Sequence, residues 1–165
     1  MANKKLTIYS VIIASYTVIS LLLGSLSFGV FQIRIAELLL VLCLYNKGFI
    51  MPVTIGCLLT NLIGIMNGTN PLILDFLIGP LATLLSALLV YMFREIRFHN
   101  MPILSLLFPV IINGIFVGLE IGFYFGINPF LAMIYVAAGE IVSVTILGLL
   151  LYKPIGKTIE RYIDV

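Results

Sequence analysis

The chain has 165 residues, of which 62% are hydrophobic and only 10% are charged, and its formal net charge is +2. Its mean hydropathy is +1.23, whereas soluble domains are roughly 45–50% apolar and about 25% charged. So few charges cannot cover the apolar surface of a water-soluble fold of this size. The composition therefore excludes that class and predicts an integral membrane protein.

Glycine, proline, asparagine and charged residues divide the chain into six apolar segments, and a spanning helix needs about 20 apolar residues. The segments cover approximately residues 6–26, 28–45, 49–66, 75–93, 102–124 and 129–152. The first is long for the core of a secretory signal, so we interpret it as a span. We predict an all-α membrane protein in which residues 1–165 form a single domain, a bundle of six transmembrane helices.

The second segment differs from the other five because polar residues interrupt it. Its uninterrupted apolar run, residues 38–45, is too short to cross a membrane alone, so a full span must include Gln32, Arg34 and Glu37. The positive-inside rule supports that span. With a cytoplasmic N-terminus, six spans place all basic residues except Arg34 on the cytoplasmic side: Lys4, Lys5, Lys47, Arg94, Arg97, Lys153, Lys157 and Arg161. We therefore predict that both termini are cytoplasmic.

Small residues recur at intervals of four, a spacing that lets membrane helices approach closely. One such stripe is Gly114, Gly118 and Gly122 in the fifth segment, and another is Gly79, Thr83 and Ala87 in the fourth. Packing within the bundle is the plain interpretation of such a stripe, and a docking surface for another membrane protein is the alternative.

Four carboxylates lie in apolar surroundings, where ionisable groups usually mark pathways, sites or buried pairs: Glu37, Asp75, Glu120 and Glu140. Arg34 is the only basic residue at a similar depth. It lies three residues before Glu37, so on a helix the two side chains share a face and are expected to form a structural ion pair. For Asp75, a helix N-cap and first-turn charge competes with a role in a site.

Glu120 and Glu140 have no such explanation and are the strongest site candidates. An unpaired buried carboxylate must protonate, meet a cation or face water. In the six-span arrangement the carboxylates line an acid-rich outer cavity, with polar companions Gln32, Asn61, Asn113 and Tyr124. Such a cavity would attract a cationic ligand or one rich in N–H donors.

Other kinds of chemistry find little support in the sequence. No Ser or Cys is visibly paired with the single histidine, His99, and no GxxxxGK phosphate loop is present. Cys43 and Cys57 lie in apolar runs without metal-ligand spacing, so we expect no metal and no cofactor. The few basic residues sit where lipid headgroups explain them, so no nucleic-acid partner is expected. Two alternatives to simple capture of a ligand stay open: a self-sufficient proton-coupled transporter and a small membrane enzyme acting on lipid or peptide.

Three motifs carry a family resemblance: QxRxxE at residues 32–37, TIGCLLTNL at residues 54–62, and D-x3-GPLATLL at residues 75–85. Over residues 16–91 the chain resembles the QueT family, and the remainder is similar more loosely through its hydropathy. The resemblance implies a six-helix substrate-binding S component of an energy-coupling factor transporter in a prokaryotic plasma membrane. Such a subunit works with a transmembrane coupling protein and two ATPase subunits.

The resemblance also implies the ligand, a queuosine precursor of the 7-deazaguanine class. We expect Glu120 and Glu140 to meet its N–H donors and a cationic amine, with Asn113 and Gln32 orienting it. Phe28, Phe31 or Tyr124 would stack on the base, with core or lipid-facing packing as the alternative for each ring, and residues 25–32 would form a lid. The AxxxA docking stripe common in the first helix of such subunits is absent, and Ser10 with Ala14 is its nearest equivalent.

Overall fold

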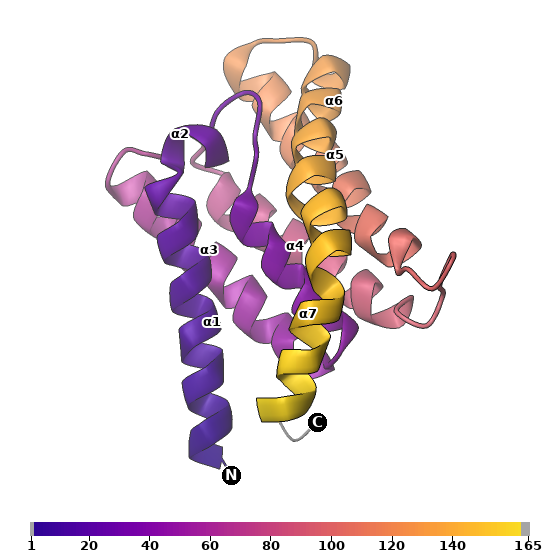
Figure 1. Ribbon diagram of the computed structural model, residues 1–165. Helices are drawn as coiled ribbons and strands as arrows, with labels where there is room; N and C mark the ends of the chain where they lie inside the picture. Colours follow the sequence, from indigo (N-terminus) through magenta and orange to yellow (C-terminus); the bar gives the residue numbers. More distant parts are fainter. Residues whose placement is uncertain (1, 163–165) are drawn as a thin grey trace.

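The computed structural model describes residues 2–162, with side chains described for residues 3–159. All of its named elements are helical (Figure 1): α1 (Ala2–Leu22), α2 (Gly24–Ser27), η1 (Ile35–Leu44), η2 (Lys47–Phe49), α3 (Ile50–Met66), α4 (Asp75–Met92), α5 (Ile103–Phe125), α6 (Pro129–Glu140), η3 (Ile141–Ile146) and α7 (Leu147–Tyr162). Of these, η1 and η2 are 3₁₀ helices and η3 is a π-helix. Within residues 2–162, α6, η3 and α7 follow one another without a loop.

Five helices in the described part of the chain are long and apolar enough to cross a membrane: Asn3–Leu22, Lys47–Met66, Asp75–Met92, Ile103–Phe125 and Pro129–Ile159. They correspond to the first, third, fourth, fifth and sixth predicted segments. The all-α membrane class is thereby confirmed. The second predicted segment is not among the long helices and contains only the shorter apolar helix Ile35–Leu44.

The second segment is an irregular stretch followed by a short helix. Residues 28–34 have no regular secondary structure, and Ile35–Leu44 is a 3₁₀ helix of 10 residues. At about 2.0 Å per residue, such a helix covers about 20 Å of a hydrocarbon core that is about 30 Å thick. Non-helical backbone at membrane depth is tolerated where protein encloses it. Gln32 and Arg34 are only 1% and 2% exposed, so this stretch meets that condition.

The helices surround η1, which contacts α1, α4, η3 and α7. Neighbouring pairs are α1 with α3, α3 with α4, α4 with α5, and α5 with α6. Both chain ends lie at one end of the bundle, and α2 lies at the opposite end (Figure 1). The segment that contains η1 therefore returns the chain from the α2 end to the end that carries the termini.

The glycine stripe of α5 packs within the bundle, against α6. A methyl group at Gly118 would meet the Met133 Cα at 2.5 Å, and one at Gly122 would meet the Pro129 Cα at 2.6 Å. Only hydrogen atoms fit at these contacts, so the stripe brings the two backbones together. The interpretation of this stripe as internal packing is confirmed.

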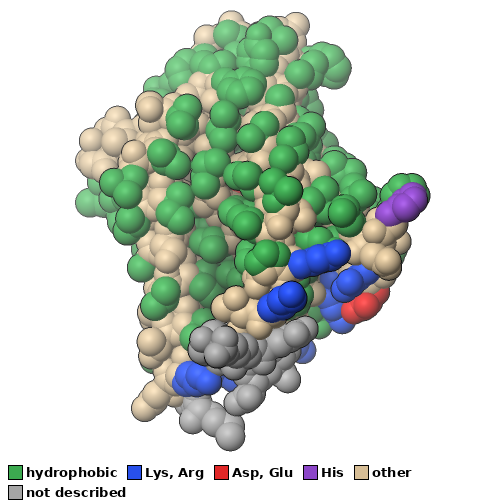
Figure 2. Space-filling view, viewed as in Figure 1, with side chains coloured by type: hydrophobic (Ala, Val, Ile, Leu, Met, Phe, Trp, Pro, Cys, Tyr) green, Lys and Arg blue, Asp and Glu red, His purple; other side chains and the backbone are tan. Residues whose placement is uncertain are grey.

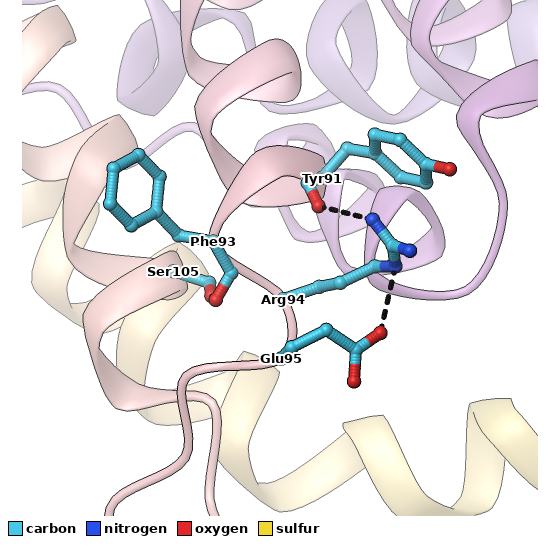
Figure 3. Close-up of polar contacts among 5 residues, drawn as sticks. All are labelled: Tyr91, Phe93, Arg94, Glu95 and Ser105. Carbon is cyan, nitrogen blue, oxygen red and sulfur yellow. Dashed lines mark hydrogen bonds and ion pairs between the residues drawn. The ribbon is translucent and has the colours of Figure 1, made fainter.

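The end of the bundle that carries the termini is basic. Hydrophobic side chains cover most of the face shown in Figure 2, whereas Lys and Arg side chains gather near the termini. Arg161, one of the predicted cytoplasmic charges, has a side chain outside the described residues. The loop after α4 contributes Arg94, whose guanidinium lies 4.0 Å from the Tyr91 ring and whose Nη1 donates to the Tyr91 carbonyl at 2.9 Å (Figure 3). Its ion pair with Glu95, at 3.2 Å, is exposed and contributes little to stability.

Candidate substrate-binding site

Eight of the nine predicted site residues form a buried polar cluster that we call the acidic cluster. Each is at most 8% exposed: Gln32, Arg34, Glu37, Asn61, Asp75, Asn113, Glu120 and Glu140. They come from the second segment and from α3, α4, α5 and α6. The ninth, Tyr124, is 53% exposed and packs its ring on Phe125, 5.0 Å between centroids. It is therefore not a buried member of the cluster.

Two hydrophobic cores flank the acidic cluster along the helices. On α5, Asn113 stands between Leu106 of one core and Val117 of the other. On the helix formed by α6 and η3, Glu140 stands between Val136 and Val144, which again belong to different cores. Asn113 and Glu140 thus lie at a level that apolar packing closes on both sides.

Glu37 is held by hydroxyl groups from two neighbouring helices. The Tyr16 hydroxyl on α1 and the Thr83 hydroxyl on α4 both donate to its Oε1, the latter at 2.9 Å. Its Oε2 has no hydrogen-bond partner in the protein. Tyr16 and Thr83 lie 21 and 46 residues from Glu37 in the chain, so no local sequence signal could reveal these contacts.

The expected ion pair between Arg34 and Glu37 is not formed. The Arg34 Nη2 donates instead to the Cys57 Sγ on α3, at 3.5 Å, and its Nη1 has no partner in the protein. The reason is the backbone at Arg34, which precedes the helix with φ −92° and ψ 78°. The prediction assumed that both residues are helical, as i, i+3 neighbours must be to share a face.

Replacing Tyr16 with phenylalanine is expected to lower the free energy of unfolding by about 1–2 kcal/mol, because it removes a buried hydrogen bond to a carboxylate. The measurement is an SDS titration of the purified protein followed by circular dichroism. Tyr9→Phe is the matched control on the same helix, since its hydroxyl donates no hydrogen bond to another described residue. Equal midpoints for the two variants would contradict the role assigned to Tyr16.

Asp75 occupies the first turn of α4 and not its N-cap, which is Leu74. Its Oδ2 accepts a hydrogen bond from the Asn70 Nδ2 at 2.9 Å, and its backbone carbonyl accepts one from the Asn61 Nδ2 at 2.7 Å. Its Oδ1 is left without a partner. The first-turn interpretation of Asp75 is thus correct in position, and the same residue also belongs to the cluster. The contribution of Asn70 was not predicted, although it lies close by in the NP turn.

Glu140 and Asn113 are joined by a hydrogen bond between α6 and α5. The Asn113 Nδ2 donates to the Glu140 Oε1 at 3.3 Å, while the Glu140 Oε2 and the Asn113 Oδ1 have no partner in the protein. Glu120 lies seven residues beyond Asn113 on α5, which is two helical turns or about 10 Å along the axis. Neither of its carboxylate oxygens has a partner.

The guanidinium of Arg34 interacts with four buried carboxylates. Arg34 interacts electrostatically with Glu37 and Asp75, and also with Glu120 and Glu140. Every member of the acidic cluster keeps at least one buried nitrogen or oxygen without a hydrogen-bond partner. Each such atom costs roughly 1–3 kcal/mol if it is left unsatisfied. Buried polar groups without a partner are rare in native structures, so their concentration in the bundle interior makes the acidic cluster the candidate binding site.

The aromatic residues predicted to stack on the base differ in their exposure to solvent. Phe28 is buried, whereas Phe31 is 47% exposed and places its ring 6.2 Å from that of Tyr135. Residues 25–27 of the proposed lid belong to α2, and the Ile33 amide, just after the lid, donates to the Leu26 carbonyl at 2.9 Å. Among residues 2–162, no group of three His, Cys, Asp or Glu side chains is placed to hold a metal ion.

Comparisons with known proteins identify the family. A profile described as QueT transporter matches residues 6–157. The chain is 31% identical over 97 residues to the queuosine precursor transporter QueT of Lactococcus lactis subsp. cremoris (strain MG1363), a match that covers 55% of this chain and 54% of the relative. The matched region thus spans about half the length of that curated relative. No solved structure matches the chain. Because the profile covers most of its length, the chain belongs to the QueT transporter family.

Proposed function

We propose that the chain is the substrate-capture S component of an energy-coupling factor importer and binds a queuosine precursor of the 7-deazaguanine class. The observation that carries the proposal is the acidic cluster, in which every member keeps an unpartnered polar atom. A guanine-type base presents N–H donors along one edge, and a carboxylate accepts two of them in a paired geometry. The family and the buried acids therefore favour the same class of ligand.

Glu140 and Glu120 are suited to opposite ends of such a ligand. Glu140 would accept the N–H edge of the base beside Asn113, which offers its free Oδ1 as a further acceptor. Glu120, about 10 Å farther along α5, would meet a cationic amine on a short arm at position 7 of the base. Gln32 has a free amide nitrogen and a free amide oxygen, so it can orient either edge.

The arrangement in the membrane follows from charge. The basic end of the bundle would face the cytoplasm, together with both termini. The chain would then pass the membrane six times, with the η1 segment as the short passage, in the plasma membrane of a prokaryote. Asp75 and Glu120 would lie toward the outside, where the solute is captured.

The coupling protein would dock on α1. Ser10 and Ala14 are both exposed on that helix, so the small-residue pair is free to contact another membrane helix. Two ATPase subunits would drive release. Cells that express the chain without the coupling protein should fail to accumulate the solute, whereas a proton-coupled transporter would accumulate it unaided.

The central prediction is that Glu140→Gln weakens binding of 7-aminomethyl-7-deazaguanine by about 10- to 100-fold, because a hydrogen bond to a charged group contributes roughly 1.5–3 kcal/mol. Affinity is measured by titration calorimetry on the purified chain, with Glu95→Gln as the control because that side chain is 75% exposed. The nitrile derivative and the unsubstituted base are titrated in parallel. Absence of binding by all three, or an unchanged affinity in Glu140→Gln, would refute the proposal.

A further inference from the structure

A groove runs between the start of α4 and the second half of α5. Its cavity volume is about 540 Å³, and its lining is almost entirely apolar: Ile73, Leu74, Ile78, Phe116, Leu119, Phe123 and Tyr124, together with Glu120. Several of these side chains are largely exposed at its rim, among them Ile73 and Phe123. The groove is therefore open along one side of the bundle.

Glu120 is the single carboxylate among these lining residues. The residue is only 8% exposed, and neither carboxylate oxygen has a hydrogen-bond partner. A nearly buried carboxylate in an apolar groove is stabilised by an ammonium group, whose N–H donors satisfy its free oxygens. The groove thus combines one anionic acceptor with an apolar wall.

Glu120 belongs both to the groove and to the acidic cluster. Glu120 lines the groove and interacts electrostatically with both Asp75 and Arg34 of the cluster. Leu74, the neighbour of Asp75 in the chain, lines the same groove. A ligand whose amine meets Glu120 would therefore hold that amine at the wall of the groove.

We propose that the α4–α5 groove is a subsite for an apolar substituent on the amine of the ligand, with the ammonium group held by Glu120. This inference rests on the proposed function, and it adds the class of substituent. An ammonium group alone would leave most of the groove unfilled, whereas a ring attached to its nitrogen would pack against Leu119 and Phe116. The protein therefore accepts N-substituted 7-aminomethyl-7-deazaguanines whose substituent is apolar.

The test compares 7-aminomethyl-7-deazaguanine with its N-benzyl derivative on the purified chain in nanodiscs. The benzyl derivative should bind about tenfold more tightly to the wild type, because its ring leaves water for the groove. Leu119→Trp fills the groove and should abolish that gain, while the affinity for the primary amine changes by less than about twofold. Retained binding of the primary amine shows that this variant is folded.

Two further variants sharpen the test. Leu104→Trp adds the same side chain at an exposed position of α5 that is not among the groove's lining residues, so it should leave the benzyl gain intact. Glu120→Gln should weaken both ammonium ligands and leave the neutral nitrile derivative unchanged. The groove proposal is overturned if the benzyl group brings no gain, or if Leu119→Trp preserves the gain. Failure of all three ligands to bind would instead refute the proposed function, and the subsite with it.

Discussion

Replacing Arg34 with methionine is expected to lower the free energy of unfolding by about 3–5 kcal/mol, the usual cost of removing one partner from a buried charge cluster. Arg34 is the only cation among the buried residues of the described chain and interacts with all four buried carboxylates. Methionine keeps the length of the side chain but leaves those acids without a positive charge. The loss of the hydrogen bond to Cys57 adds to the cost.

Circular dichroism during an SDS titration measures the change in stability. Arg97→Met is the matched control, since Arg97 is exposed in the loop after α4, and it should shift the midpoint by less than about 0.5 kcal/mol. Arg34→Lys should recover part of the loss because it restores the charge without the planar fork. Equal unfolding midpoints for Arg34→Met and Arg97→Met would show that the buried carboxylates do not need Arg34 to stabilise the fold.

Gly139→Ala is expected to destabilise the protein by about 3 kcal/mol, at the upper end of the cost of overpacking. A methyl group at Gly139 would collide with the carbonyl oxygen of Gln32, which is backbone and cannot rotate away. The irregular stretch would have to leave α6, and both Gln32 and the adjacent Glu140 would move. This glycine therefore allows the backbone that carries Gln32 to lie against the helix that carries Glu140.

Thiol labelling provides the measurement for Gly139→Ala. Cys43 and Cys57 are both free and fully buried, so a maleimide dye reacts with them only when the bundle opens. Heating should permit labelling at a lower temperature in Gly139→Ala than in the wild type. Gly24→Ala is the control, because its added methyl group would meet the Thr69 Cβ at an ordinary 3.6 Å. Identical labelling curves for the two variants would show that the Gln32 contact is not tight.

Five of the six apolar segments became long helices near their predicted bounds, because hydropathy and helix-breaking residues are local signals. The second segment could not be predicted in the same way. Its 3₁₀ and irregular geometry depends on enclosure by α1, α4 and α7 and on the close approach of Gln32 to Gly139. Apolar periodicity over ten residues does not distinguish this arrangement from an α-helix.

The buried acids and amides were predictable for a related reason. A polar group in an apolar run has few places to go except the interior of a bundle, and Glu120, Glu140 and Asn113 all lie there. Their partners were not predictable, because Tyr16 and Thr83 belong to other segments and have no unusual neighbours in sequence. The same limitation explains the Arg34–Glu37 pair, which was expected from local spacing but is prevented by the backbone before η1.

The helices α6, η3 and α7 form one continuous helix. The π-helix at Ile141–Ile146 changes which side of that helix faces the interior. A π turn holds more residues than an α turn, so side chains after it are displaced around the axis relative to those before it. Val136 lies in the core shared with α5, whereas Val144 and Tyr152 lie farther along the helix in the core around η1. Glu140 is the last residue before this change of phase. Because no loop separates Glu140 from Lys153, the buried acid and the basic end of the molecule lie on one continuous helix.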